Sequence, residues 1–489
     1  MLNNKLTKTI FDKSRPGKTG YILPKLDVPE IDISKHIDNK LLKKESFNML
    51  ELTEPEVVRH FINLSTKNHH VDKDFYPLGS CTMKYNPKIN DSIAMLSQFS
   101  QIHPDDNQDF IQGTLKVYYE LGEMLCEITG MDDITLQPSA GSQGELVGLL
   151  LMKKYHEKKN NLNKKYIIIP KTAHGTNPAS VIMSGYLVKQ VESDDRGRVD
   201  INHLKELVDS ETAGMMLTQP NTLGLFEDNI EMICDIIHSK DGLMYMDGAN
   251  LNALVGIAQP SKMGFDITHI NLHKTFSTPH GGGGPGAGPV AVNSKLSKFL
   301  PNPMIRLEDD KYVFKKLEDS IGNLHTFCGN FGVLIRAYVY ILSHGKLGLK
   351  DIATKAVLNA NYLKAKLIDN FNVPFSEGSL HEFVISALEQ KKKGMKALDF
   401  AKNLLDFGFH APTIYFPTNV PESIMIEPTE TETKETLDEF SSKMNEMHHS
   451  IDDKLDYYKD APYKTPVRKL NETKANREPV LRWIKNESS

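Results

Sequence analysis

Residues 243–286 read LMYMDGANLNALVGIAQPSKMGFDITHINLHKTFSTPHGGGGPG, and this stretch decides the fold. It opens with an apolar run that ends at Asp247, which is typical of a buried strand with a polar residue at its carboxyl end. Further on, Lys274 lies between another apolar run and a glycine-rich loop. In open α/β sheets, ligands bind outside the carboxyl ends of the strands. We therefore expect Asp247 and Lys274 to belong to one ligand site.

Apolar runs and amphipathic helical patterns alternate around this stretch. The runs that indicate buried strands are residues 166–169, 187–191, 215–217 and 243–246. Helical patterns cover residues 113–130 and 229–238. Two further helical patterns begin near Gln143 and after Asp200, and Asp200 suits a helix cap. Alternation of this kind predicts parallel βαβ units with helices on both faces of the sheet.

The pattern changes along the chain suggest three regions. Residues 1–108 are irregular and predict an extended N-terminal arm, whereas residues 109–345 carry the large α/β domain. Residues 346–489 predict a smaller C-terminal α/β domain with a surface tail. Its expected elements are a helix at residues 351–369 and strands at residues 383–386 and 424–426.

Composition excludes several classes of protein. A formal net charge of -5 leaves no basic excess with which to bind nucleic acid. No run approaches the roughly 18 apolar residues of a membrane span, and the basic N-terminus lacks the apolar core of a secretory signal. The four cysteines show no CxxC spacing, which favours a reducing compartment. We expect a cytoplasmic enzyme.

Lys274 and Asp247 together favour pyridoxal phosphate (PLP) as cofactor. A lysine amine forms a Schiff base with the PLP aldehyde. A carboxylate beside the pyridine nitrogen raises the pKa of that nitrogen and keeps it protonated. Each residue also has an ordinary explanation, Lys274 as a surface lysine and Asp247 as a cap or turn former. The pair in this order, rather than either residue alone, favours PLP.

A phosphate site is predicted at residues 138–145, PSAGSQGE, just before a helix. Small residues let backbone N–H groups approach a phosphate, and a helix N-terminus favours negative charge. The predicted phosphate contacts are Ala140, Gly141, Ser142 and Gln143. A plain capped turn is the alternative explanation.

The remaining candidates surround the PLP ring. His174 follows a buried strand and could stack on the ring, although it could equally be a hydrogen-bonded loop histidine. Ala249 and His273 stand beside Asp247 and Lys274 and are counted as cofactor contacts. His280 and residues 281–284 form a loop that would leave room for substrate, or merely a flexible linker. The adjacent histidines at positions 69 and 70 lack partners with ligand spacing, so we expect no metal there.

Long strings resemble the glycine decarboxylase P-protein family of the glycine cleavage system. The strings are YPLGSCTMKYNP (76–87), AHGTNPAS (173–180), PNTLG (220–224), DGAN (247–250), NLHKTF (271–276), GNFG (329–332), HEFV (381–384), APT (411–413) and EPTET (427–431). The chain is similar over its whole length to the C-terminal half of that protein, which some bacteria and archaea make as a separate subunit. It departs at Ser139 and Ser142, where the family is expected to carry Asn and Ala, and at Asn323, where a basic residue is more usual.

The resemblance implies the fold type I of PLP-dependent transferases and a decarboxylation of glycine. Glycine's amine would displace Lys274 from PLP, CO₂ would leave, and the remaining carbon would attack the lipoyl disulfide of H-protein. His174 would stack on the ring, Asp247 would pair with its nitrogen, and Asn221 would contact its phenolic oxygen. A subunit 1 (α subunit) without the cofactor lysine would complete an α2β2 heterotetramer.

Two alternatives and one gap stay open. The residues themselves also suit another fold-type-I amino-acid decarboxylase or lyase. A non-catalytic scaffold subunit is the second alternative function. The group that binds the glycine carboxylate is not evident, because only nine arginines are present and Arg336 is merely one candidate.

Overall fold

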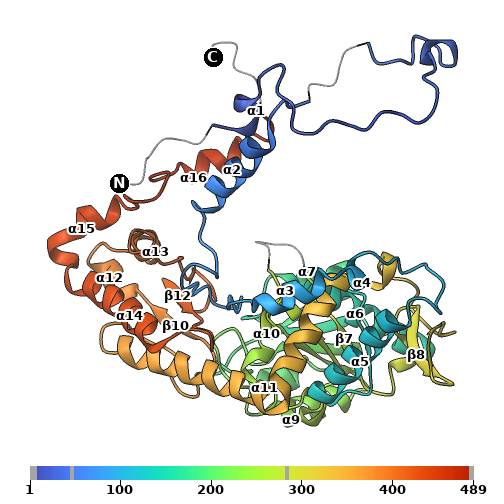
Figure 1. The fold of residues 1–489 in the computed structure, drawn as a ribbon. Helices are drawn as coiled ribbons and strands as arrows, with labels where there is room; N and C mark the ends of the chain where they lie inside the picture. The colour runs from blue at the N-terminus through green and yellow to red at the C-terminus, as the bar shows by residue number, and fades with distance from the viewer. Residues whose placement is uncertain (1–7, 45–48, 281–285, 484–489) are drawn as a thin grey trace. The chain divides into compact units, whose positions relative to one another are not determined.

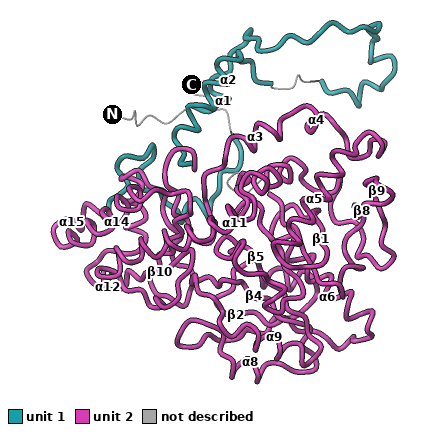
Figure 2. The backbone as a smooth tube through the Cα atoms, turned by 60° about the horizontal axis from the view of Figure 1, so that its bottom comes forward, with its two compact units in different colours: residues 1–70, 460–489 teal, residues 71–459 magenta. Residues whose placement is uncertain are grey.

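The computed structural model describes residues 8–44, 49–280 and 286–483. The chain divides into two compact units, residues 1–70 with 460–489, and residues 71–459 (Figure 2). The second unit holds both the large sheet and the smaller sheet described below. The domain boundaries at residues 108 and 345 stay predictions.

A seven-stranded sheet forms the centre of the second unit (Figure 1). Its strand order is β1-β7-β6-β5-β4-β2-β3, and the pairs from β3 to β6 are parallel. Strand β7 runs antiparallel to both β6 and β1. The strands are β1 (Asp133–Thr135), β2 (Tyr166–Pro170), β3 (Leu187–Val191), β4 (Thr212–Thr218), β5 (Leu243–Gly248), β6 (Ile267–Ile270) and β7 (Val290–Val292). The mainly parallel sheet is as predicted.

Helices cover both faces of this sheet. On one face, Met215 and Leu217 of β4 belong to a core that also contains residues of α5 (Gln112–Thr129), α9 (Ile230–His238) and α11 (Phe331–Leu367). On the other face, Ala213 and Met216 pack with α6 (Gly141–Lys158) and α7 (Thr176–Met183). Met215, Met216 and Leu217 thus alternate between the two cores, because successive side chains of a strand point to opposite faces.

Helix α11 begins well before the helix expected at residues 351–369. The backbone leaves the helical region at Gly345, with φ 59° and ψ -178°, and the chain is helical on both sides of it. The segment Thr326–Leu367 is long and apolar enough to cross a membrane by length and composition alone. Buried residues such as Leu334 and Ala353 belong to the core against the main sheet, whereas Ala360, Leu363 and Leu367 belong to the core of the smaller sheet.

A smaller antiparallel sheet, in the order β10-β12-β11, has its own core in the C-terminal part of the second unit. Its strands are β10 (Phe383–Ser386), β11 (Thr413–Ile414) and β12 (Ser423–Ile426), so the strands expected at residues 383–386 and 424–426 are confirmed. The helices around it are α12 (Leu388–Lys392), α13 (Ala397–Asp406), α14 (Lys434–His449) and α15 (Ile451–Lys459).

The other elements are short. The second unit also contains α3 (Lys88–Ala94), α4 (Ser97–Ser100), α8 (Ile201–Leu207), α10 (Leu272–Thr275) and the hairpin of β8 (Met304–Glu308) and β9 (Lys311–Lys315). Its 3₁₀ turns are η2 (Leu251–Ala253), η3 (Pro260–Met263), η4 (Ser297–Phe299) and η5 (Thr326–Cys328). The first unit contains α1 (Ile10–Lys13), η1 (Ile33–Lys35), α2 (Glu54–Ser65) and α16 (Glu472–Arg477).

Candidate active site

A cavity of about 670 Å³ opens at the carboxyl ends of β4, β5 and β6. Its position agrees with the rule that ligands bind at this edge of an α/β sheet. The lining residues are Ser80, Cys81, Ser139, Ala140, Gly141, Ser142, Glu145, His174, Thr176, Thr218, Thr222, Asp247, Ala249, His269, Asn271, His273, Lys274, His280, Gly286 and Asn330.

The floor of the cavity consists of three strand residues in register. Thr218 of β4 pairs with Asp247 of β5, which pairs with His269 of β6. Asp247 is 3% exposed and accepts hydrogen bonds from Asn177 Nδ2 at 3.1 Å and from the Ala249 N–H at 3.0 Å. The latter closes a turn, so the turn-forming role and the cofactor role of Asp247 are compatible.

Asp247 remains a carboxylate in spite of its burial. Burial alone would raise its pKa, but His269 and the hydrogen bonds from Ala249 and Asn177 hold the pKa below its usual value. His269 Nε2 lies 3.4 Å from Asp247 Oδ1, while its Nδ1 lies 2.7 Å from the Tyr245 hydroxyl. Burial lowers the pKa of His269, although the charge of Asp247 opposes this shift. The cavity floor therefore presents a fixed negative charge.

Lys274 comes from the one-turn helix α10, directly after β6. It is 8% exposed, which contradicts the surface-lysine explanation. Its Nζ donates a hydrogen bond of 2.7 Å to the Ser80 carbonyl oxygen. Among the described residues, no carboxylate lies within ion-pair distance of this amine. The amine of Lys274 is thus held in the cavity without a permanent charge partner.

The N-terminus of α6 borders the cavity opposite the strands. The helix begins at Gly141, and Ala140, Gly141 and Ser142 line the cavity. No side chain among the described residues caps its first turn. The first N–H groups of a helix have no intrahelical partner, so they are available to an anion. A Cβ atom at Gly141 would lie 2.1 Å from Asn271 Oδ1, so only glycine fits this close approach.

Gln143 and Asn221 were predicted to contact the cofactor, but neither lines the cavity. Gln143 Oε1 accepts hydrogen bonds from the Ser139 N–H at 2.6 Å and from the Ser139 hydroxyl at 2.9 Å. The Asn221 carboxamide donates to the Gly197 carbonyl and accepts from the Leu223 and Leu225 N–H groups. Both side chains thus stabilise turns beside the site, and their cofactor contacts stay predictions.

His174 and Glu145 form the side of the cavity nearest α7. His174 is exposed, lines the cavity, and accepts a hydrogen bond of 3.2 Å from the Thr176 N–H at Nδ1, so the loop-histidine description also fits it. Glu145 is 3% exposed and accepts from the Thr176 and Ser180 hydroxyls. Burial, together with the charge of Asp247, raises the pKa of Glu145 to about 7.

Two histidines beside Lys274 offer free polar atoms to the cavity. Nδ1 of His273 and Nδ1 of His280 are buried and have no hydrogen-bond partner among the described residues. Burial, with a contribution from Lys274, lowers the pKa of His273 to about 3, so this ring is neutral. Residues 281–284 of the predicted substrate loop lie outside the described residues.

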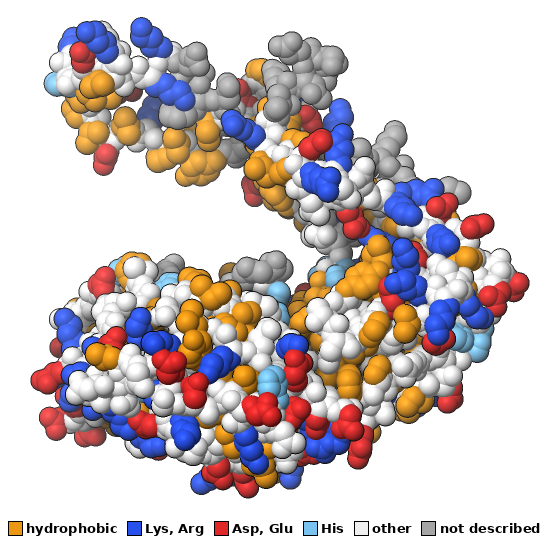
Figure 3. Space-filling model, turned by 180° about the vertical axis from the view of Figure 1, so that it is seen from behind, with side chains coloured by type: hydrophobic (Ala, Val, Ile, Leu, Met, Phe, Trp, Pro, Cys, Tyr) orange, Lys and Arg blue, Asp and Glu red, His pale blue; other side chains and the backbone are white. Residues whose placement is uncertain are grey.

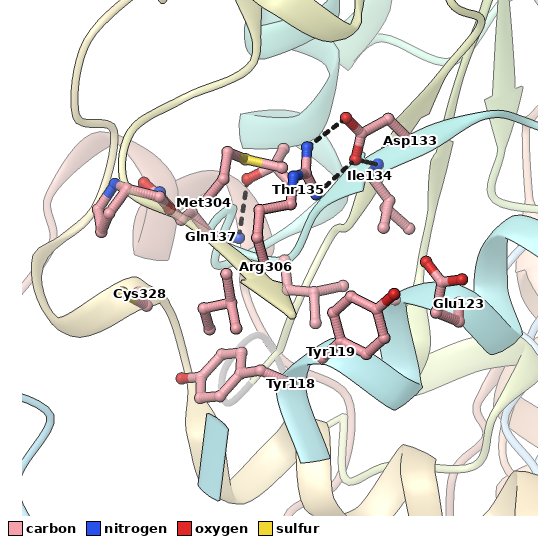
Figure 4. Close-up of a pocket in the computed structure, with 14 residues that line it drawn as sticks. Tyr118, Tyr119, Glu123, Asp133, Ile134, Thr135, Gln137, Met304, Arg306 and Cys328 are labelled. Atoms are coloured by element: carbon pink, nitrogen blue, oxygen red, sulfur yellow. Dashed lines mark hydrogen bonds and ion pairs between the residues drawn. The ribbon is translucent and has the colours of Figure 1, made fainter. Parts of the chain in front are cut away.

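No arginine is among the described residues that line the large cavity. Arg336 instead pairs with Asp91 at 2.6 Å and donates to the Gly332 carbonyl. A second cavity, of about 50 Å³, does contain Arg306. Figure 4 shows the Arg306 guanidinium turned to the carboxylate of Asp133, with N–O distances of 3.1 and 2.5 Å. Both arginines are occupied elsewhere.

Several lining residues were missed in the sequence. Thr218 and His269 are polar residues within buried strands, and Glu145 directly precedes the apolar run of helix α6. A polar residue at the end of a buried strand is the signal that could have found Thr218. Ser80 differs from these, because residues 76–84 were expected at the mouth of the site without roles for single residues; the fold brings its carbonyl to Lys274.

The arrangement fits PLP. A buried amine, a buried carboxylate and an uncapped helix N-terminus face one cavity, and they match the aldehyde, the ring nitrogen and the phosphate. The orphaned nitrogens of His273 and His280 add polar atoms that a ligand with oxygen substituents would satisfy.

Two family models match the chain. Residues 16–317 match the glycine cleavage system P-protein, and residues 352–466 match the C-terminal domain of glycine dehydrogenase. A probable glycine dehydrogenase (decarboxylating) subunit 2 of Bacillus licheniformis is 51% identical over 99% of this chain and 100% of its own length. A protein of the same name from Staphylococcus saprophyticus is 49% identical over 99% and 98% of the two chains.

Solved structures share the fold. A glycine decarboxylase (P-protein) of the glycine cleavage system, in inhibitor-bound form, superposes with a TM-score of 0.72 at 18% identity, covering 85% of this chain and 94% of that one. The glutamate decarboxylase of Lactobacillus brevis gives a TM-score of 0.65 at 14% identity, over 86% and 97% of the two chains. At such identities the likeness concerns the fold alone.

Proposed function

The chain belongs to the P-protein family of the glycine cleavage system, and we propose that Lys274, Asp247 and the N-terminus of α6 are the residues with which it carries out the decarboxylation of glycine. The fold is fold type I of the PLP-dependent enzymes, and the cofactor is PLP. The observation that carries the proposal is the meeting of a buried amine and a buried carboxylate in one cavity.

When bound, PLP supplies the electron sink that accepts the electron pair released as CO₂ leaves glycine. Asp247 provides the negative charge that stabilises a proton on the ring nitrogen. Because Asn177 and the Ala249 N–H hold this carboxylate, its charge is already oriented before the reaction begins.

The phosphate would be held by the N–H groups of Gly141 and Ser142, which need no side-chain charge to bind an anion. Lys274 would provide the amine for the aldehyde, and the ring of His174, which lines the same cavity, would cover the heterocycle. Asn221 and Gln143 would support the site indirectly, because their side chains stabilise turns beside the cavity.

The absence of arginine from the described cavity lining suits a decarboxylase. A carboxylate paired with an arginine is stabilised as an ion, and that stabilisation is lost when the charge leaves as CO₂. The described lining offers amide, hydroxyl and imidazole groups to the substrate.

The name "subunit 2" of the relatives implies a subunit 1 as partner. We further propose an α2β2 heterotetramer in the cytoplasm that passes the aminomethyl group to lipoylated H-protein. Residues 21–31 support a partner, because Tyr21, Ile22 and Leu23 are 77%, 81% and 78% exposed in this unit. Apolar surface of this kind marks interaction sites, and Figure 3 shows apolar side chains on the surface of the first unit.

The decisive experiment is the release of CO₂ from carboxyl-labelled glycine by this chain combined with subunit 1. We expect release that depends on PLP and lipoylated H-protein. Release from a larger amino acid but not from glycine would overturn the proposal in favour of another PLP decarboxylase. A protein that binds no PLP would instead be a scaffold subunit.

A further inference from the structure

Two buried carboxylates of the smaller sheet lie behind the cavity wall. Glu382 directly precedes β10, Glu427 directly follows β12, and the two strands pair in antiparallel fashion. The side chains of Glu382 and Glu427 are 0% and 1% exposed. His381 is equally buried, and its Nε2 lies 3.8 Å from Glu382 Oε1 and 3.9 Å from Glu427 Oε1. None of the three lines the cavity.

The two carboxylates hold a loop whose backbone is otherwise unfavourable. Glu382 accepts a hydrogen bond of 2.7 Å from the Ser80 N–H, and Glu427 accepts one of 2.9 Å from the Thr82 N–H. The Thr82 hydroxyl also donates to Glu427. Ser80 and Thr82 have φ angles of 63° and 46°, in the left-handed region that residues with a Cβ avoid. External hydrogen bonds must therefore stabilise this conformation.

The same loop also binds the amine of Lys274 through a hydrogen bond. The Ser80 carbonyl accepts the hydrogen bond from Lys274 Nζ at 2.7 Å, and Ser80 and Cys81 line the cavity. On its other side the loop is anchored to the smaller sheet, where the Gly79 carbonyl accepts from the Thr413 hydroxyl at 3.0 Å. A Cβ at Gly79 would lie 2.2 Å from Met425, which shows how closely loop and sheet approach.

We propose that Glu382 and Glu427 are positioning residues that hold the Ser80–Thr82 loop so that the Ser80 carbonyl fixes the Lys274 amine at the point where it meets the cofactor. The inference rests on the proposed role of Lys274. A lysine side chain has four rotatable bonds, and ordering it in one position has an entropic cost. The carbonyl restricts the amine before the cofactor arrives, and the two carboxylates restrict the carbonyl.

The charge of the cluster agrees with this role. Burial and the proximity of Glu427 raise the pKa of Glu382 well above its usual value, which favours the protonated form of Glu382. A protonated Glu382 reduces the repulsion between the two buried carboxyl groups. A divalent cation is the competing occupant, because one ring nitrogen and two carboxylate oxygens lie within 4.8 Å of one another.

The test compares Glu382→Gln and Glu427→Gln with Glu227→Gln, a matched control. Glu227 is also 1% exposed and accepts a backbone N–H, from Val199 at 2.8 Å, but does not touch the cavity. The measurement is the rate at which the cofactor-free protein attaches PLP to Lys274, followed by visible absorption and peptide mapping after borohydride reduction. We expect attachment at least about tenfold slower in Glu427→Gln, because a glutamine has only one side-chain oxygen and cannot accept both hydrogen bonds from Thr82. The loss should be smaller in Glu382→Gln, whose amide oxygen can still accept the Ser80 N–H, and the control should stay within about twofold of the wild type.

A rescue variant separates loop geometry from folding. Ser80→Gly placed in the Glu382→Gln background should restore much of the lost rate, because glycine adopts a φ of 63° without strain. If the Gln variants do not fold, Thr82→Val removes only the hydroxyl contact with Glu427 and should slow attachment in the same direction.

The outcomes are distinct. Wild-type protein that never attaches PLP to Lys274 contradicts the proposed function itself. Wild-type attachment combined with unchanged rates in both Gln variants overturns only the positioning role. A stoichiometric divalent cation in the purified protein that disappears in Glu427→Gln would also overturn it, and would turn the cluster into a metal site.

Discussion

Two buried lysines lie near the smaller sheet, and their surroundings differ. Lys84 pairs with Glu430 at 2.7 Å and also donates to Asn252 and to the Thr275 carbonyl. Lys274 has only the Ser80 carbonyl as a partner among the described residues. A permanent ion pair would hinder the reaction of an amine, so this difference supports the proposal that Lys274 is the reactive lysine and that Lys84 has a structural role.

Asp247→Asn should remove most of the activity without unfolding the protein. An amide cannot supply the charge that keeps the ring nitrogen protonated, so we expect kcat to fall by about 100-fold or more. The control is Asp266→Asn, since Asp266 is 2% exposed and accepts the Met244 N–H but lies outside the cavity. Asp266→Asn should lower stability and leave kcat within a few-fold. Equal losses of kcat in both variants would contradict the role of Asp247.

Glu227→Gln should change how stability depends on pH. Burial raises the pKa of Glu227 to about 7, above the 4.5 of a free glutamate, so the folded state keeps its proton while the unfolded state ionises. Stability from this group is complete below pH 4.5 and is lost as pH rises to 7, by about 3 kcal/mol. The variant should lack this loss in urea unfolding at pH 5 and pH 7.5. Glu389→Gln, at an exposed position, should keep the wild-type slope.

The sequence predicts those site residues that lie in or beside a strand or helix with a clear apolar pattern. Asp247, Lys274 and residues 140–142 each border an apolar strand or open a helix, and the structure places them at one cavity. Asn221 and Gln143 show the limit, because nothing local reveals that their amides are occupied by neighbouring backbone or by Ser139. Contacts over long sequence separations, such as Ser80 with Glu382, depend on the tertiary fold.

At the scale of elements, helices and strands with a clear periodic pattern of apolar residues are predicted best. Helix α5 (Gln112–Thr129) and strands β3 and β10 agree with the sequence pattern to within a residue. Strand β6 was not predicted, because Thr268 and His269 interrupt its four residues. The start of α11 was missed because Gly345 and the polar residues around it suggest a break, whereas the helix continues past a kink. Local propensity is a weak guide where packing decides.

Gly141→Ala should weaken PLP binding through the N-terminus of α6. The added methyl would meet Asn271 Oδ1, so either the helix end or the Asn271 side chain must move, and both line the cavity at the proposed phosphate site. We expect the Kd for PLP to rise by about tenfold, or about 1.4 kcal/mol. The matched control is Gly113→Ala in α5, where nothing lies within 4 Å of the new Cβ. This variant should leave the Kd unchanged, and an unchanged Kd in Gly141→Ala would refute the phosphate site.

At the scale of the molecule, the two units differ in how they bury apolar side chains. The second unit has large cores on both faces of its main sheet, whereas the first unit exposes many apolar residues. On the face of the second unit drawn in Figure 3, acidic and basic side chains are interspersed. The apolar surface of the first unit is therefore where a partner would gain most by association.

Ile22→Asp and Leu23→Asp should weaken the association with subunit 1. A charge placed in an apolar contact must be desolvated, so we expect the dissociation constant to rise by about tenfold or more. Leu162→Asp is the control, because Leu162 is 76% exposed in the second unit, after α6. Analytical ultracentrifugation of the mixed subunits measures the effect. If Leu162→Asp weakens association as much as the two arm variants, residues 21–31 are not the interface.

The chemistry of the whole molecule depends on which side chain carries PLP. Borohydride reduction of the PLP-loaded protein, followed by protease digestion and mass spectrometry, locates that side chain directly. The structure predicts one pyridoxyl group per chain, on the peptide that contains Lys274. A pyridoxyl group on Lys84 or on any other lysine, with Lys274 unmodified, would contradict the account.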